Sequence, residues 1–200
     1  GEIIAYLLSG RTLECCVTRS DMLHGKIAGL YPSQCPTGQE DNFEILANRL
    51  AAGGLQVWLQ TDGRKPDLLE KLLKIKDAHV ICNLVGNHET STKIFGGAPT
   101  KEELAKTIAL VQATPGGVVR FLAMPLPFGD GWQWPQREDA VAAAKLVAEA
   151  CGQPTMPYSI TPIAADSVWD MRGLDPLPDQ NLLMYRSASR QYMFKADIVY

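Results

Sequence analysis

The stretch LQVWLQTDGRKPDLLEKL, residues 55–72, contains one complete strand–turn–helix unit. Its first six residues are aliphatic, aromatic or amide side chains that predict a buried strand. Thr61, Asp62 and Gly63 supply the turn that ends this strand. Pro66 suits the first turn of a helix, and four leucines between residues 68 and 73 form its apolar face. The unit is typical of an α/β protein.

The same alternation of strand and helix runs along most of the chain. Strands are expected at residues 3–8, 26–31, 55–60, 79–85, 118–124 and 156–163, and helices at about 40–53, 66–73, 101–114 and 137–150. Strands that are apolar on both faces belong to a parallel sheet covered by helices. We therefore predict an α/β fold, an open, partial (β/α)6 barrel with its helices outside. A doubly wound sheet is the alternative.

Residues 1–163 are expected to form this barrel, and residues 164–200 a tail of different character. Within the barrel, a loop rich in proline, glycine and tryptophan is expected at 125–135. The tail begins with a polar loop at 166–179, continues with a short helix at 181–192 and ends in an apolar segment at 193–200. Because an unpaired strand edge invites wrong pairing, the tail is expected to pack on the barrel edge or on a partner.

Composition narrows the classes of partner. The chain of 200 residues has 19 Lys and Arg against 22 Asp and Glu, a net charge of −3, with the two signs interspersed. This pattern argues against binding to nucleic acid or to anionic membranes. No apolar run approaches the roughly 18 residues that a membrane span needs. Five cysteines at irregular spacing favour a reducing, cytoplasmic location over a disulfide framework.

The loop LLSGRTLECCVT, residues 7–18, follows the first expected strand. It resembles the cluster loop of the radical SAM enzymes, in which a glycine is followed by Cys-x3-Cys-x2-Cys. Arg11 stands here at the first ligand position, Cys15 at the second and Thr18 at the third. A guanidinium or a hydroxyl cannot replace a thiolate on iron, so two of the three ligands are missing.

The resemblance continues in order along residues 3–163. Radical SAM activases carry Gly-Gly-Glu-Pro-Thr after the second strand, which holds the amino group of the SAM methionine. Residues 33–37 read SQCPT, which keeps the proline and threonine and loses the glycines and the glutamate. Residues 61–63 and 95–97 look like later segments of the activating enzymes of anaerobic ribonucleotide reductase and pyruvate formate-lyase. The resemblance implies a [4Fe–4S] cluster and S-adenosylmethionine, but the lost motifs predict that neither cofactor is bound.

Two other sites remain as hypotheses. Cys15, Cys16 and Cys35 are all expected near the barrel mouth, where with His24 or His88 they would hold zinc or an atypical iron–sulfur cluster. The adjacent pair of cysteines is poor geometry for chelating one ion, and ordinary partly buried thiols are the simpler interpretation. Acid–base catalysis is the second hypothesis, with His88, Glu89 and Asp62 as weak candidates at strand ends.

The sequence therefore predicts a catalytically silent radical-SAM-like barrel that works as a binding, regulatory or assembly subunit. By analogy its partner would be an activase or a glycyl-radical enzyme. The alternative is an enzyme with a non-standard iron–sulfur or metal site at the barrel mouth.

Overall fold

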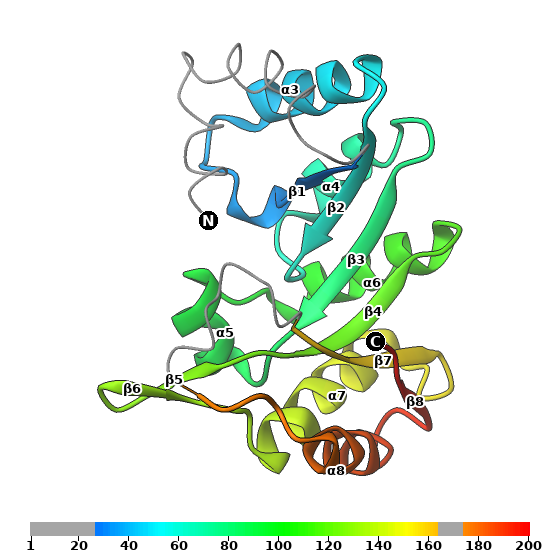
Figure 1. Ribbon diagram of the computed structural model, residues 1–200. Coiled ribbons are helices and arrows are strands. Elements are labelled where there is room, and N and C mark those ends of the chain that lie inside the picture. Colours follow the sequence, from blue (N-terminus) through cyan, green and yellow to red (C-terminus); the bar gives the residue numbers. More distant parts are fainter. Residues whose placement is uncertain (1–26, 164–173) are drawn as a thin grey trace.

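A computed structural model describes residues 27–163 and 174–200 of the chain. The expected first strand and its loop, with Arg11, Cys15, Cys16, Thr18 and His24, lie outside these residues. The described chain forms an α/β fold around a parallel sheet (Figure 1). The sheet consists of β1 (Ile27–Leu30), β2 (Gln56–Thr61), β3 (His79–Leu84), β4 (Val118–Ala123), β7 (Pro157–Pro162) and β8 (Lys195–Ile198).

The strands are neighbours in the order in which they occur along the chain, β1-β2-β3-β4-β7-β8. Every pairing between them is parallel. The order contains no reversal of the kind that defines a doubly wound sheet. β1 and β8 lie at opposite ends, and no pairing among the described strands closes the sheet.

The helices follow the strands as the sequence predicts. They are α3 (Glu40–Ala52), α4 (Pro66–Leu72), α6 (Lys101–Ala113), α7 (Arg137–Cys151) and α8 (Asp179–Ser189). In Figure 1, α4, α6 and α7 lie behind the sheet. Helix α6 begins with the predicted capping box, in which Thr100 and Glu103 satisfy each other's backbone N–H groups. No helix within 27–163 or 174–200 is long and apolar enough to cross a lipid bilayer.

Three short elements differ from the expectation. The 3-10 turn η1 (Pro32–Gln34) and helix α5 (His88–Phe95) lie where loops were expected. Residues 125–135, also expected as a loop, contain the antiparallel hairpin β5 (Leu126–Phe128) and β6 (Gly131–Gln133). A two-residue Gly129-Asp130 turn joins its strands, and Gly129 supplies the positive φ of 54° that such a turn requires.

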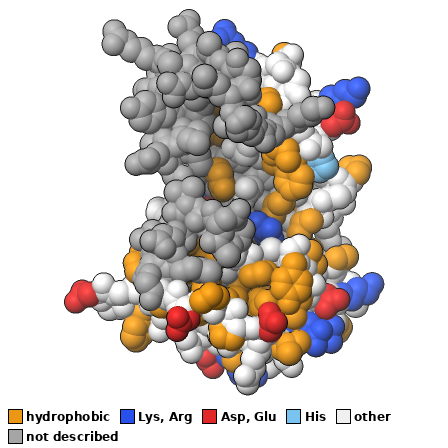
Figure 2. Space-filling view, in the orientation of Figure 1, with side chains coloured by type: hydrophobic (Ala, Val, Ile, Leu, Met, Phe, Trp, Pro, Cys, Tyr) orange, Lys and Arg blue, Asp and Glu red, His pale blue; other side chains and the backbone are white. Residues whose placement is uncertain are grey.

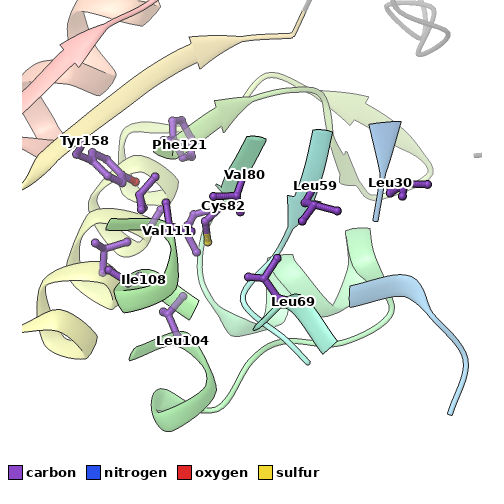
Figure 3. Packing of buried hydrophobic residues seen from close by; sticks show 14 of the residues in the cluster. Leu30, Leu59, Leu69, Val80, Cys82, Leu104, Ile108, Val111, Phe121 and Tyr158 are labelled. Atoms are coloured by element: carbon purple, nitrogen blue, oxygen red, sulfur yellow. The ribbon is translucent and has the colours of Figure 1, made fainter. Parts of the chain in front are cut away.

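The main core lies between the sheet and the helices. Alternate residues of each strand point into it, as the alternating burial of β2 and β4 shows. Figure 3 shows Leu59, Val80 and Cys82 from the sheet with Leu69 and Ile108 from the helices. Each fully buried aliphatic side chain contributes about 1.5–3 kcal/mol of transfer free energy.

We use the name open face for the opposite face of the sheet, meaning only the side turned away from α4, α6 and α7. It carries the other residues of each strand, among them Trp58, Gln60, Asn83, Arg120 and Ser159. Figure 2 views the molecule from this side, because the orientation is that of Figure 1. Hydrophobic side chains gather in this view near the carboxyl terminus, where Val199 and Tyr200 are exposed.

Candidate functional site

The carboxyl ends of β1 and β2 meet in a network of buried polar side chains. Ser33 Oγ lies 2.7 Å from Thr61 Oγ1, and it accepts a hydrogen bond of 3.1 Å from the backbone N–H of Asp62. Thr61 Oγ1 in turn accepts from the N–H of Gly63 at 3.1 Å. The turn after β2 is therefore held by hydrogen bonds to two side-chain hydroxyl groups.

Asp62 is buried and forms an ion pair with Arg64. The Arg64 Nη2 group donates to Asp62 Oδ2 at 2.6 Å, and Arg64 Nε donates to both carboxylate oxygens at 3.1 Å. The same guanidinium donates from Nη2 to the backbone carbonyl of Phe95 at 2.9 Å. Gln34 Nε2 also donates to that carbonyl, at 3.2 Å. The pair therefore ties β2, η1 and the carboxyl end of α5 together.

Asp62 therefore has a structural role in this turn. Its oxygens are occupied by Arg64, and its side chain is only 3% exposed. Breaking a buried pair of this kind leaves an uncompensated charge. No hydrogen bond or ion pair described for Asp62 involves His88 or Glu89, the other two catalytic candidates.

His88 and Glu89 form the exposed first turn of α5. Asn87 caps this helix by accepting a hydrogen bond of 2.9 Å from the N–H of Thr90. Glu89 pairs with Lys93 at 2.7 Å, one helical turn away, and this hydrogen bond lowers the pKa of the Glu89 carboxyl. Surface pairs at this spacing are common in helices without a catalytic role.

Cys35 lies at the end of η1 and belongs to the main hydrophobic core, with 3% of its surface exposed. Burial raises the pKa of its thiol, and the charge of nearby Lys65 only partly opposes this effect. A metal-binding cysteine needs its thiolate form, so the environment of Cys35 is a poor one for a ligand. Nowhere in the described ranges do three His, Cys, Asp or Glu side chains gather to hold a metal ion.

The cofactors implied by the family resemblance do not fit these residues. Ser33 and Gln34 occupy positions where the family has its SAM-binding turn, but their side chains bond to Thr61 and to the Phe95 carbonyl. No carboxylate stands at the motif to hold an ammonium group. The donor set of the loop, with Arg11 and Thr18, likewise offers too few thiolates for a cluster.

A second polar group crosses the open face in the middle of the sheet. Arg120 Nε donates to Asn83 Oδ1 at 2.6 Å, and Asn83 Nδ2 donates to Gln60 Oε1 at 3.1 Å. Asn83 is 5% exposed, and Arg120 is half-buried. We call Gln60, Asn83 and Arg120 the polar layer. It links β2, β3 and β4 through side chains as well as through the backbone.

Tyr31 lies near this layer at the end of β1. Burial raises the pKa of its phenol, and the positive charge of Arg120 partly opposes this rise. Burial also lowers the pKa of the Arg120 guanidinium, with Tyr31 opposing that change. The two groups therefore share one partly desolvated environment, in which charge interactions are stronger than in water.

An aromatic pair lies on the same face, nearer the start of β3. The rings of Trp58 and His79 stack with centroids 4.8 Å apart and planes 20° apart. Gln56 bridges them, because its Oε1 accepts from Trp58 Nε1 at 3.0 Å and its Nε2 lies 2.7 Å from His79 Nε2. An amide nitrogen only donates, so His79 Nε2 stands as the acceptor in this bridge.

The sequence interpretation missed the polar layer, although a signal was present. Gln60, Asn83 and Arg120 occupy alternate positions within otherwise apolar strands. Such a position points away from the helix-covered core. Treating the strands as apolar on both faces hid this pattern. Comparison of the sequence with models of known protein families gave no match, and comparison with curated proteins found no similar sequence.

Proposed function

We propose that the chain is a catalytically silent, radical-SAM-like partial (β/α)6 barrel that works as a binding, regulatory or assembly subunit. The chain order of the parallel strands supports the partial barrel, because each unit adds its strand beside the previous one. The family relationship itself rests on the succession of sequence motifs.

One observation carries the functional part of the proposal. The side chains at the carboxyl edge of β1 and β2 bind one another instead of presenting free groups to a cofactor. In parallel α/β proteins this edge is where ligands usually bind and where reactions occur. An edge with its polar groups already paired favours a scaffold over an enzyme.

Anaerobic purification tests this proposal directly. Silent protein is expected to be colourless, free of iron and zinc by elemental analysis, and unable to cleave S-adenosylmethionine after chemical reduction. A brown protein with a charge-transfer band, or stoichiometric zinc, would contradict the proposal. Either result would support the alternative enzyme with a metal site at Cys15, Cys16 and Cys35, although the burial of Cys35 argues against that set.

A matched variant tests the family relationship separately. The double substitution Arg11→Cys and Thr18→Cys restores Cys-x3-Cys-x2-Cys at positions 11, 15 and 18. If the loop retains the geometry of the radical SAM cluster loop, reconstitution with iron and sulfide gives this variant, and not the wild type, a [4Fe–4S] spectrum. A control with cysteines at Arg137 and Glu138, on the exposed start of α7, is expected to stay colourless.

The partner proposed by analogy is an activase or a glycyl-radical enzyme. Direct binding to a purified protein of either kind, measured by titration calorimetry, tests this part. Absence of binding to both would remove the analogy while leaving the metal analysis unaffected.

A further inference from the structure

Arg120 is the only basic side chain of a row that crosses the open face of the sheet. Asn83 pairs with Arg120 in the backbone register, Arg120 with Ser159, and Ser159 with Asp197. Thr61 pairs with Cys82, so Asp62 lies at the level of Asn83 and continues the row. The row therefore has one guanidinium near its middle and one carboxylate towards each end.

Neither carboxylate neutralises Arg120. Asp62 is bound by Arg64 through three contacts of 2.6–3.1 Å. Asp197 pairs with Arg186 of α8 at 3.6 Å. The ion pairs formed within residues 27–163 and 174–200 do not include Arg120. Within the described ranges Arg120 is therefore a partly buried cation without a counter-ion, which is unfavourable, and a bound anion would supply the missing charge.

The neighbours of Arg120 hold its guanidinium in one orientation. Asn83 donates its amide N–H to Gln60 at 3.1 Å, which turns the amide oxygen towards Arg120 Nε at 2.6 Å. With Nε occupied, the two Nη groups form the remaining donor edge, and they have no hydrogen-bond acceptor in the described part of the chain. Two parallel N–H donors on a fixed plane match an anion that presents two oxygens.

We propose that the polar layer of Gln60, Asn83 and Arg120 is a binding site for a small oxyanion, the carboxylate or phosphate group of a ligand held against the open face. Arg120 binds the two oxygens through Nη1 and Nη2, and Asn83 and Gln60 fix its plane. The phenol of Tyr31 adds a further hydrogen-bond donor beside the cation. Gln60, Asn83 and Arg120 all lie in described strands, so the proposed site does not depend on a relationship to radical SAM enzymes.

Thermal unfolding of the intact chain with sodium phosphate or sodium malonate tests the site, with sodium chloride at equal ionic strength as the reference. An anion that binds only the folded state raises Tm in proportion to the logarithm of its concentration above Kd, by about 3–5 °C at ten times its Kd. Phosphate and malonate together distinguish the two sources of the oxyanion. Failure of both anions to raise Tm above the chloride reference would overturn the proposal.

Variants connect any stabilisation to Arg120. Arg120→Met is expected to abolish it, and Arg120→Lys to weaken binding roughly tenfold because the planar fork is lost. Arg49→Met, on the exposed face of α3, is the matched control and is expected to behave like the wild type. Equal stabilisation of the wild type and Arg120→Met would contradict the site.

The unliganded variants give a second, independent result. Arg120→Met alone would leave the buried amide oxygen of Asn83 unsatisfied, so the double variant Arg120→Met/Asn83→Leu is used. If Arg120 lacks a counter-ion within the chain, this double variant has a Tm equal to or above that of the wild type without anion. A large drop in its Tm would show that a carboxylate of the chain already pairs with Arg120, and it would overturn the proposal. Iron in the purified protein would contradict the proposed function but would not change either result.

Discussion

Arg64 lies two residues after Asp62 and holds its carboxylate through both Nε and Nη2, at 2.6–3.1 Å. The same Nη2 group reaches the Phe95 carbonyl at 2.9 Å. One guanidinium thus serves a buried carboxylate and the carboxyl end of a helix, where a positive charge is favourable. Substitutions that disturb the contacts of Arg64 are therefore expected to lower the free energy of unfolding.

Asp62→Asn is expected to lower the free energy of unfolding by about 3 kcal/mol, because it leaves the Arg64 charge without its partner in a largely buried place. Urea unfolding followed by circular dichroism measures the change. Asp67→Asn is the control, since Asp67 is exposed and pairs with Lys106 on the surface. That variant is expected to unfold at the wild-type urea concentration. Equal effects at the two positions would show that burial of the pair does not matter.

Gly97→Ala is expected to disturb the same pair from the other side. A Cβ atom at Gly97 would lie 2.5 Å from Arg64 Nη1, so the guanidinium would have to move. The stabilities of Gly97→Ala, Asp62→Asn and the double variant form a thermodynamic cycle. We expect the double variant to lose less stability than the sum of the single losses, because both changes break one interaction. Additive losses would mean that Gly97 acts independently of the pair.

Tyr158→Phe is expected to raise the free energy of unfolding by about 1 kcal/mol. The Tyr158 hydroxyl is fully buried and has no hydrogen-bond partner among residues 27–163 and 174–200, so its removal relieves a desolvation cost. Tyr185→Phe is the matched variant, because the Tyr185 hydroxyl donates to the Pro135 carbonyl at 2.5 Å. Its loss is expected to lower stability by about 1–2 kcal/mol. The prediction is confirmed if the free energy of unfolding rises in Tyr158→Phe and falls in Tyr185→Phe.

Stability is expected to fall as the pH rises above the ordinary range of a thiol. Burial, and secondarily the charge of Asp62, raises the pKa of the Cys82 thiol far above its usual value. The folded chain keeps a proton that the unfolded chain releases above about pH 8.5, so the stabilisation is complete below that pH and is lost above it. The loss amounts to about 1.4 kcal/mol per pH unit for this one group.

Urea unfolding between about pH 8.5 and pH 10 measures that slope. Cys82→Ala is expected to flatten it, whatever its effect on stability at neutral pH. Cys151→Ala, which removes a half-exposed thiol at the end of α7, is the matched control. A slope insensitive to Cys82 would show that this thiol ionises in the folded protein.

The sequence predicted the helix-covered parallel sheet because strand and helix periodicities are strong in this chain. The five described strands that were expected, and helices such as α6 with its capping box, appear within a few residues of their predicted limits. Helix α5 was missed because HETSTKIF is poor in helix-favouring residues, and its ends depend on the Asn87 cap and on Gly96. The β5–β6 hairpin was missed because prolines on both sides obscured its turn.

The candidate site was only partly predictable. The position of Asp62 along the chain correctly predicted that it lies at a strand end. It did not predict the ion pair with Arg64, because that pair depends on the path of the turn. Cys35 was expected near the mouth, as an ordinary partly buried thiol or, in the alternative, as a metal ligand, and the turn η1 directs it into the core. The polar layer required knowledge of register, because three residues far apart in sequence meet only when neighbouring strands are aligned.

Because side chains alternate along each strand, the residues that form the core and the residues that line the open face are different ones. Residues such as Leu59, Cys82 and Phe121 hold the fold together from one side, and the intervening positions 60, 83 and 120 project from the other. Substitutions at those intervening positions can therefore change the chemistry of that face, while the packing that makes the chain fold stays as it is.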